Sequence, residues 1–172
     1  MQNLFEKAYF IVYNITREYI MIKILFVCHG NICRSTMAEF IMKEIVRKAA
    51  KEVEYEITSC ATTNDEIGND IYPLAKKVLD KHNIPYERHF ARRFKCEDYD
   101  NNDYIIVMDD ENLYDLRYMV RDNDKKIHKL MEYLNETRDV SDPWYTRDFD
   151  KAYDDIYKGC CKLFMFLEKE VD

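Results

Sequence analysis

Two residues suited to cleaving phosphate esters lie close together near the start of the chain. Residues 28 to 35 read Cys-His-Gly-Asn-Ile-Cys-Arg-Ser, so five residues separate Cys28 from Arg34. A thiolate can attack phosphorus, and a guanidinium fork can bind two phosphate oxygens at once. Between them, Gly30 permits close backbone approach or positive φ, and Asn31 tolerates left-handed angles. The spacing predicts a loop that curls around one phosphate dianion, with Cys28 beneath the phosphorus.

The elements on either side of this segment are suited to position it. The apolar run 22–27 predicts a buried strand, and residues 36–50 have the pattern of a helix. A loop between a strand and a helix N-terminus directs backbone N–H groups and the positive end of the helix dipole at an anion. Such surroundings favour the thiolate form of a cysteine, and the Ser35 hydroxyl could hydrogen-bond the Cys28 sulfur. The bare pattern also fits a buried structural cysteine and a surface arginine, but these neighbours favour catalysis.

A carboxylic acid about a hundred residues downstream could supply the proton that this chemistry needs. The leaving oxygen of a phosphate ester requires a proton donor, and a thiolate cannot be its own. The segment Asp142-Pro143-Trp144-Tyr145 lies in a polar stretch between two helical patterns. Pro143 biases Asp142 away from helical angles. Alone, Asp-Pro is a turn signal, but with the Cys-Arg loop it predicts a general acid above the site, with Trp144 and Tyr145 as cleft walls.

These motifs together resemble the low-molecular-weight protein tyrosine phosphatase family, and the resemblance covers residues 21 to 172. Four further segments carry it, in the family's order. They are Ser59-Cys60-Ala61-Thr62, Ile67-Gly68-Asn69, His89-Phe90-Ala91-Arg92 and the strand segment Asp103-Tyr104-Ile105-Ile106-Val107-Met108-Asp109.

The resemblance implies a role for each matching residue. Cys28 would be the nucleophile, Arg34 the phosphate ligand and Asp142 the general acid and later the base. Asn31 would hold the loop shape, and Ser35 would tune the sulfur. Ser59 and His89 would bond to the loop's polar groups. The phosphate-binding loop as a whole would consist of His29, Gly30, Asn31, Ile32, Cys33, Arg34 and Ser35.

The implied reaction consists of two displacements on a phosphotyrosine-containing protein or peptide. Cys28 takes the phosphoryl group, Asp142 protonates the phenol, and water then releases inorganic phosphate. No metal and no organic cofactor is required. Because turnover needs an ionised thiol and a protonated acid at once, activity should peak on the mildly acidic side of neutral. The family also uses the cysteine equivalent to Cys33 as a redox partner of the nucleophile, which implies a reversible disulfide.

Three departures from the family pattern bear on specificity. His29 stands where the family usually has an apolar or small residue, and it could contact substrate or point to solvent, the second being favoured. Thr36 replaces a common proline but can still open a helix. Asp65 occupies the position of an aromatic wall in animal members. The cleft wall would then depend on Trp144 and Tyr145, with His29 as a further candidate, and its mouth would be more open and more acidic.

Three alternatives remain beside a tyrosine phosphatase. A related protein-phosphoarginine phosphatase subgroup has threonine where this chain has Ile32, whose apolar side chain suits an aromatic ring better than a guanidinium. Arsenate reductases share the loop but need further redox cysteines, and Cys96 has no partner at the expected short spacing. A non-catalytic phosphotyrosine-binding module would have no use for Asp142.

The composition agrees with one enzyme domain. With 172 residues, 47% of them hydrophobic, the chain can bury a single core and is too short for two ordinary domains. A net charge of −7 argues against a nucleic-acid partner. The six cysteines form no framework of a small secreted protein and indicate a reducing cytoplasm. Cys96, Cys160 and Cys161 are interpreted as packing residues, and Cys60 as a residue at a strand end near the site.

The predicted architecture is α/β: one doubly wound domain with a four-stranded parallel sheet, helices on both faces and the phosphate loop after the first strand. Helices are predicted over residues 36–50, 72–82, 110–120 and 148–170. The last has an apolar stripe that we interpret as core. Residues 1–20 lie outside the resemblance and are interpreted as an N-terminal extension, either not native or poorly ordered, with an apolar run too short to span a membrane. The phosphatase domain is predicted over 21–172.

Overall fold

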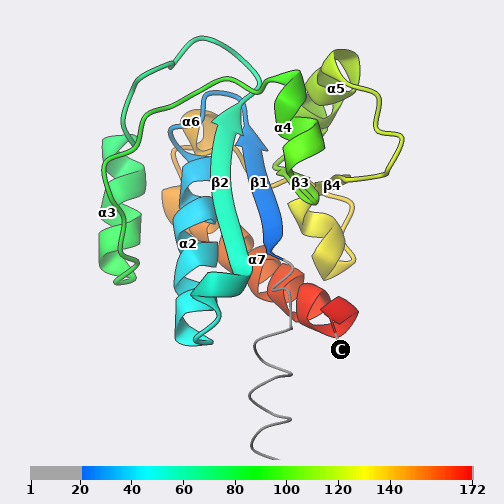
Figure 1. Ribbon diagram of the computed structural model, residues 1–172. Helices are drawn as coiled ribbons and strands as arrows, with labels where there is room; N and C mark the ends of the chain where they lie inside the picture. The colour runs from blue at the N-terminus through cyan, green and yellow to red at the C-terminus, as the bar shows by residue number, and fades with distance from the viewer. Residues whose placement is uncertain (1–20, 172) are drawn as a thin grey trace, which may run out of the picture.

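Four parallel strands form the centre of the fold (Figure 1). The computed structural model describes residues 21–171, and the interpretation of residues 1–20 lies outside this range. The strands are β1 (Ile22–Cys28), β2 (Tyr55–Ala61), β3 (Tyr104–Val107) and β4 (Ile127–Lys129), and their order in the sheet is β2-β1-β3-β4. Every paired neighbour is parallel. The four-stranded parallel sheet predicted from the sequence is therefore confirmed.

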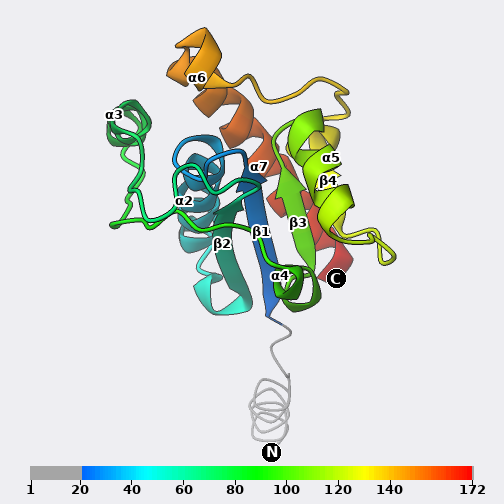
Figure 2. The same ribbon diagram turned by 90° about the horizontal axis from the view of Figure 1, so that it is seen from above.

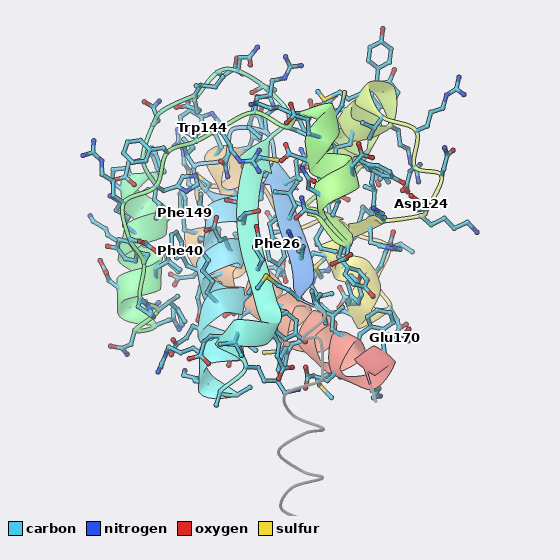
Figure 3. The ribbon with its side chains drawn as sticks, in the orientation of Figure 1. Phe26, Phe40, Asp124, Trp144, Phe149 and Glu170 are labelled. Carbon is cyan, nitrogen blue, oxygen red and sulfur yellow. The ribbon has the colours of Figure 1, made fainter. Side chains whose placement is uncertain are left out.

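Helices cover both faces of this sheet, because alternate side chains of each strand point to opposite sides. Ile24 and Phe26 of β1 belong to the larger core, beneath α2 (Arg34–Lys48), α3 (Pro73–Lys81) and α7 (Phe149–Val171). Leu25 and Val27 belong to a second core, beneath α4 (Cys96–Asn101) and α5 (Asp110–Met119). Figure 2 shows the two layers on either side of the strands, and Figure 3 shows the buried Phe26 near the centre of the molecule. The predicted doubly wound arrangement is confirmed.

The four predicted helices are present, with ends displaced by up to two residues. Predicted helix 36–50 begins at Arg34 instead, so Arg34 and Ser35 belong to its first turn. Its start is held by the Cys33 carbonyl, which accepts bonds from the Met37 N–H at 2.9 Å and the Thr36 hydroxyl at 2.8 Å. It ends at Lys48, just before Ala50 adopts a left-handed φ of 56°. The other three differ by at most one residue at either end.

The apolar stripe of α7 packs into the larger core, as the sequence predicted. Its core-facing residues are Phe149, Ala152, Tyr153, Ile156, Cys160, Leu163 and Leu167, with Phe164 partly buried beside them. Close packing continues at Gly159, where a Cβ atom would lie 2.6 Å from Cγ of Leu130. Leu130 opens the 3-10 helix η2 (Leu130–Leu134), which directly follows β4. The helix therefore approaches η2 more closely than any side chain at Gly159 would permit.

Several short elements had no clear signal in the sequence. They are β4, α4, α6 (Pro143–Thr146) and the 3-10 helices η1 (Glu52–Glu54) and η2. The interpretation of Cys96 as a packing residue is wrong, because its position at the start of α4 leaves it exposed. Cys160 is buried in α7, as predicted, and Cys161 is half-buried. Cys60 lies next to the end of β2 in the second core, also as predicted.

Candidate active site

The Cys-Arg segment lies at the carboxyl end of the central strand β1. Cys28 is the last residue of that strand, and Arg34 is the first residue of α2. The loop between them is thus held at both ends by regular structure. Open parallel sheets bind ligands at this edge, outside the carboxyl ends of their strands. The fold therefore places the predicted phosphate loop where such sheets carry their sites.

Asn31 determines the shape of the loop. It is fully buried and has a left-handed φ of 58°, the conformation that its residue type tolerates best after glycine. Its side-chain amide donates hydrogen bonds to Ser35 Oγ at 3.0 Å and Ser59 Oγ at 2.8 Å. Its side-chain oxygen accepts from His89 Nε2 at 3.1 Å and from the Arg92 N–H at 3.2 Å. Every polar group of this amide is satisfied, so the unusual backbone angle is held from several sides.

Gly30 is needed for close approach and not for an unusual backbone angle. Asn31 carries the positive φ of this loop, whereas Gly30 is outside that region. A Cβ atom on Gly30 would lie 3.1 Å from Cγ of Glu66. Of the two reasons that the sequence offered for this glycine, the structure supports close approach.

The Cys28 sulfur lies 3.0 Å from Ser35 Oγ, in a buried environment. Ser35 Oγ already accepts a hydrogen bond from Asn31. Its single proton can be donated to the sulfur or to the Cys60 carbonyl, and the carbonyl is more distant at 3.5 Å. A hydroxyl that donates to sulfur stabilises a thiolate more than a thiol, because the charged acceptor forms the stronger bond.

Arg34 is buried, with its side chain 3% exposed, and two carboxylates hold it. Its Nη1 donates to Asp109 Oδ2 and its Nη2 to Asp142 Oδ2, each at 2.6 Å. Nη1 also lies 3.3 Å from the Val140 carbonyl oxygen. Burial opposes the charge on this guanidinium, but Cys28, Asp109 and Asp142 outweigh that effect and raise its pKa. A permanently charged, fixed fork thus lies beside the cysteine.

Asp142 reaches the site as the N-cap residue of the short helix α6. Its φ of −81° and ψ of 110° are extended, and its Oδ1 accepts the N–H of Trp144 at 2.9 Å. Pro143 occupies the first helical position, where its missing N–H costs nothing. The preceding chain is tied to the sheet by the Val140 N–H, which donates to the Met108 carbonyl at 2.9 Å. The aspartate predicted on a loop is therefore a helix cap whose second oxygen is directed at Arg34.

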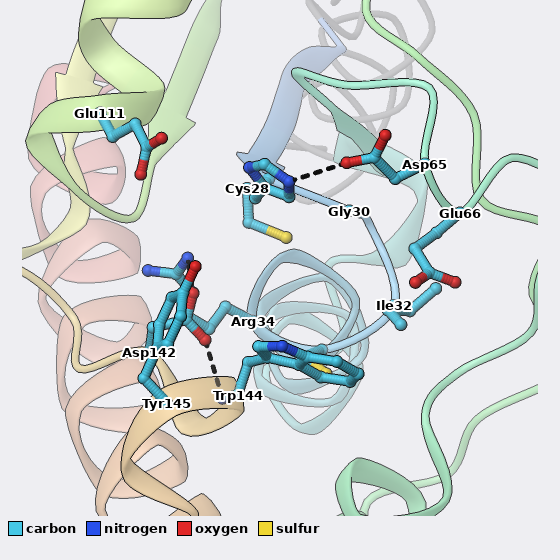
Figure 4. Close-up of a pocket in the computed structure, with 12 residues that line it drawn as sticks. Cys28, Gly30, Ile32, Arg34, Asp65, Glu66, Glu111, Asp142, Trp144 and Tyr145 are labelled. Atoms are coloured by element: carbon cyan, nitrogen blue, oxygen red, sulfur yellow. Dashed lines mark hydrogen bonds and ion pairs between the residues drawn. The ribbon is translucent and has the colours of Figure 1, made fainter.

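One pocket of about 220 Å³ joins these groups. Figure 4 shows the Cys28 sulfur directed into it, with Trp144 and Tyr145 on the α6 side and Asp65 and Glu66 across from them. The lining residues are Cys28, His29, Gly30, Ile32, Cys33, Arg34, Asp65, Glu66, Glu111, Asp142, Trp144 and Tyr145. The structure thus brings together the predicted catalytic residues, most of the loop and the predicted cleft walls.

The mouth of this pocket is acidic, because Asp65, Glu66 and Glu111 line it. It is also partly open, since two of its side chains are almost half exposed. His29 is 46% exposed, and its Nε2 lies 3.1 Å from Asp65 Oδ2. Its side chain therefore reaches both solvent and the pocket edge. Trp144 is 45% exposed and packs edge-on against Tyr72, with ring centroids 5.6 Å apart. Ile32 is nearly buried and contributes an apolar surface.

Cys33 lines the same pocket as Cys28, but its surroundings favour the protonated thiol. Burial raises the pKa of the Cys33 thiol well above its ordinary value, and the neighbouring Cys28 and Asp142 raise it further. Burial also raises the pKa of Cys60. Both thiols therefore stay protonated near neutral pH.

Sequence reasoning missed three groups of the site. Asp109, which binds Arg34, was noted only as the end of a strand segment. Its position just after β3, at the ligand-binding edge of the sheet, is the signal that could have identified it. Glu39 accepts a 2.5 Å hydrogen bond from Ser59 Oγ and so supports the Asn31 network. Glu111, at the start of α5, completes the rim of the pocket.

Within residues 21–171, no group of three or more His, Cys, Asp or Glu side chains is arranged to hold a metal ion. The pocket instead combines a sulfur nucleophile, a guanidinium and a carboxyl group. These are the parts of a cysteine-dependent phosphoric monoester hydrolase on a doubly wound sheet.

Comparison with known proteins identifies the family to which the chain belongs. A sequence model of the low molecular weight phosphotyrosine protein phosphatases matches residues 23–172. YfkJ of Bacillus subtilis, named a low molecular weight protein-tyrosine-phosphatase, is 37% identical over 153 residues, and the match covers 87% of this chain and 98% of the relative. The chain belongs to the low molecular weight phosphotyrosine protein phosphatase family, and its function is that of a protein tyrosine phosphatase.

Solved structures agree with this assignment. The crystal structure of YfkJ has a TM-score of 0.85 at 36% identity, covering 88% of this chain and 98% of the other. SP-PTP from Streptococcus pyogenes, a low molecular weight protein tyrosine phosphatase, has a TM-score of 0.76 at 38% identity, with 86% and 93% covered. DARP, described as drosophila arginine phosphatase, has a TM-score of 0.78 at 27% identity, with 85% and 98% covered.

Proposed function

We propose that the chain hydrolyses phosphotyrosine in proteins through a phosphocysteine formed on Cys28, with Arg34 binding the phosphate and Asp142 as general acid and then base. The observation that carries this proposal is the convergence of these three side chains in one pocket, with Arg34 bonded to Asp142 at 2.6 Å. The nucleophile, the electrophilic clamp and the proton donor are all side chains, so the reaction needs no cofactor. Its products are the dephosphorylated tyrosine and inorganic phosphate.

The first displacement requires an exchange of partners at Arg34. A phosphate that binds the guanidinium through two oxygens replaces Asp142 at Nη2, while Asp109 continues to hold Nη1. Release from Arg34 frees the Asp142 carboxyl group to turn toward the leaving oxygen of the substrate. Substrate binding therefore also frees the general acid for its role.

The sulfur then attacks phosphorus in line as the phenol oxygen leaves with the proton of Asp142. Backbone N–H groups of the loop and Arg34 stabilise the equatorial oxygens. In the second displacement the ionised Asp142 takes a proton from water, which attacks the phosphocysteine and expels the Cys28 thiolate. The Ser35 hydroxyl, 3.0 Å from the sulfur, stabilises that leaving thiolate.

Phosphoarginine is the second candidate substrate, because DARP shares the fold at 27% identity. The nearly buried Ile32 and the indole of Trp144 favour an aromatic leaving group over a charged guanidinium, which would lose hydration against them. We therefore expect phosphotyrosine to be the preferred substrate, and direct competition between the two phosphoamino acids tests this preference.

The decisive experiment measures hydrolysis of matched phosphotyrosine, phosphoserine and phosphoarginine peptides. We expect fast turnover of phosphotyrosine alone, loss of activity in Cys28→Ser and a fall of about a hundredfold or more in Asp142→Ala, because general acid catalysis contributes about 10²–10⁴. Cys96→Ser, which changes an exposed cysteine outside the pocket, serves as the control. Preference for phosphoarginine would move the substrate assignment, and tight binding without turnover would favour a binding module.

The pH profile offers a second check. Activity should follow a bell with its maximum on the mildly acidic side of neutral, since the first step needs an ionised sulfur and a protonated carboxyl together. Asp142→Asn should flatten the alkaline limb. A rate that rises steadily to strongly alkaline pH would contradict the assignment of the acid.

We also propose that Cys33 protects the nucleophile from irreversible oxidation. Peroxide converts the Cys28 thiolate to a sulfenic acid, and the Cys33 thiol then displaces water to form a disulfide that thiol reductants reopen. Both cysteines line the same pocket, and both are free. After peroxide, dithiothreitol should restore most activity to the wild type but little to Cys33→Ser. Equal recovery would remove this role from Cys33.

A cytoplasmic location fits the same redox chemistry, since reduced cysteines are kept in that compartment. No helix in the described range, residues 21–171, has the length and apolar character to cross a membrane. The net charge of −7 is unfavourable for binding nucleic acid. The partners that we propose are phosphotyrosine-containing proteins, and we propose neither nucleic acid nor a membrane as a partner.

A further inference from the structure

A second hollow adjoins the active-site pocket. It lies between the loop after β2 and the outer side of α5, which meet at the same end of the sheet (Figure 1). Its lining residues are Thr62, Thr63, Asn64, Asp65, Arg93, Tyr114, Asp115, Tyr118 and Met119, and we call it the α5 groove. Asp65 lines both the groove and the active-site pocket. A chain that leaves the pocket past Asp65 therefore enters the α5 groove.

Aromatic rings form one wall of the α5 groove. Tyr114 is 73% exposed and Tyr118 is 88% exposed. They lie four residues apart on α5, so their side chains share one face of the helix. Exposed tyrosines that border a hollow offer flat faces for a cation or a peptide side chain. Asp115 lies between them in sequence and lines the same hollow.

The floor of the groove contains a polar group whose partner is not in the described chain. Thr62 is 2% exposed, and its hydroxyl has no hydrogen-bond partner within residues 21–171. Its backbone N–H donates to the Cys28 carbonyl at 2.9 Å, so this threonine is fixed directly behind the proposed nucleophile. A buried hydroxyl without a partner is unfavourable. The hydroxyl oxygen itself is closed off from solvent, so Thr62 is a buried part of the floor and not a group that a bound peptide reaches.

The charges around the two hollows favour a positive occupant. The mouth of the active-site pocket carries Asp65, Glu66 and Glu111, and the groove adds Asp115. Besides Arg34 in the catalytic centre, the basic residues that line the two hollows are His29, which bonds to Asp65, and Arg93, whose Nε donates to the Thr62 carbonyl at 3.2 Å. Apart from the catalytic Arg34 and Asp142, four carboxylates therefore face one arginine and one histidine. A peptide flank with a positive side chain would reduce this excess of negative charge.

We propose that the α5 groove is a substrate subsite that takes a lysine or arginine side chain close to the phosphotyrosine. The cation lies against Tyr114 or Tyr118 and pairs with Asp115 and Asp65. The inference rests on the proposed function and narrows its substrates to phosphotyrosine segments with a basic flank. Neither the resemblance to the family nor the pocket itself requires this groove.

The test compares phosphotyrosine peptides that differ at one position only. Lysine, alanine or glutamate is placed in turn at each position on either side of the phosphotyrosine, and p-nitrophenyl phosphate, which has no flanks, is the reference. We expect one flanking position at which lysine exceeds glutamate in kcat/KM by roughly fivefold, the size of an exposed ion pair. High salt should weaken this preference. Equal rates for all three residues at every position would overturn the subsite.

Two variants that each remove one negative charge test whether the lysine preference arises in the α5 groove. Asp115→Asn should reduce the lysine preference, relative to the reference substrate, to about twofold or less. Asp154→Asn changes the same charge on an exposed residue of α7, over the opposite face of the sheet, and should leave the preference as in the wild type. Equal losses in both variants would mean that net charge, and not a subsite, sets the preference, and would overturn the proposal.

Failure of the proposed function is distinguishable from these outcomes, since the wild type would then turn over neither the phosphotyrosine peptides nor the reference substrate.

Discussion

At the scale of single residues, Asp109 shows how one carboxylate can serve two elements. Its Oδ2 accepts a 2.6 Å hydrogen bond from Arg34, and its Oδ1 accepts the N–H of Asn112 at 2.7 Å as the cap of α5. The guanidinium is therefore oriented by a group that is itself fixed by a helix end. Positioning of this kind matters because a phosphate ligand must be held to within a fraction of an ångström.

Asp109→Asn separates the two roles of this residue. Asparagine caps helices as well as aspartate does, so α5 should keep its start while Arg34 loses a charged partner. A hydrogen bond to a charged group contributes about 1.5–3 kcal/mol, and we expect kcat/KM for p-nitrophenyl phosphate to fall by roughly tenfold to a hundredfold. Steady-state kinetics and thermal unfolding together check this.

The matched control for that experiment is Asp109→Ala, which also removes the cap. It should lower the melting temperature where Asp109→Asn does not, at a similar loss of activity. Full activity in Asp109→Asn would show that Arg34 needs no second carboxylate to hold it.

At the scale of elements, α2 carries a charged cluster whose contribution depends on pH. Glu44 is nearly buried, and both of its oxygens accept hydrogen bonds from Arg47, at 2.7 and 2.8 Å. Lys48 lies 3.4 Å away. The hydrogen bonds from Arg47, more than the opposing effect of burial, lower the pKa of Glu44 to about 2.

Glu44→Gln should therefore destabilise the protein near neutral pH and progressively less in acid. The unfolded chain binds this proton near its ordinary pKa of about 4.3, whereas the folded protein resists it down to about 2. The stabilisation is complete above the higher value and is lost as pH falls to the lower one. Urea unfolding at a series of pH values measures the difference between wild type and variant.

An exposed glutamate without an ion pair in the described structure provides the control for this series. Glu87→Gln should change stability little at any pH. A destabilisation by Glu44→Gln that stayed constant into strong acid would assign the effect to packing and not to charge.

The contact of α7 with η2 yields a prediction against the usual helix propensity. Replacing a glycine inside a helix by alanine ordinarily stabilises it by about 1 kcal/mol. At Gly159 the new Cβ would lie 2.6 Å from Cγ of the fully buried Leu130, and such overpacking costs about 1–3 kcal/mol. We expect Gly159→Ala to lower the melting temperature by about 3 °C.

A double-mutant cycle identifies the cause of that loss. Leu130→Ala makes room for the new methyl group, so the pair should be less destabilised than the sum of the single variants. A higher melting temperature for Gly159→Ala would show that α7 can move away from η2 without cost.

At the scale of the whole molecule, the sheet, both cores and the site are complete within the described residues. β1 begins at Ile22, and the family match begins at residue 23. We therefore propose that residues 21–172 form the phosphatase domain and that residues 1–20 are an extension dispensable for folding and catalysis.

A chain beginning at Met21 should keep its melting temperature and its kcat/KM for p-nitrophenyl phosphate. A chain beginning at Ile24 is the control, because it loses Lys23, whose backbone N–H donates to Asp103 Oδ2 at 2.8 Å, and Ile22, which pairs with Tyr55. That shorter chain should be destabilised. Loss of activity in the Met21 chain would assign the extension a role in the enzyme.

The sequence by itself determined the features that depend on local order along the chain. Apolar periodicity predicted the parallel sheet and the four longer helices to within two residues, because strands and helices repeat their buried positions at different intervals. The Cys-x5-Arg spacing predicted a loop with both groups on one ligand, and Asp142-Pro143 predicted an extended aspartate. Short elements such as β4 and α6 were not predicted, because three or four residues are too few to show a periodic pattern of apolar side chains.

Only the tertiary structure decided which distant groups meet. Asp109 and Asp142 bind Arg34 from 75 and 108 residues away, and no local pattern encodes such a pairing. The α5 groove likewise exists only because the loop after β2 and the outer face of α5 reach the same edge of the sheet. Local sequence sets which conformation each segment prefers, whereas the order of strands in the sheet sets which segment ends become neighbours.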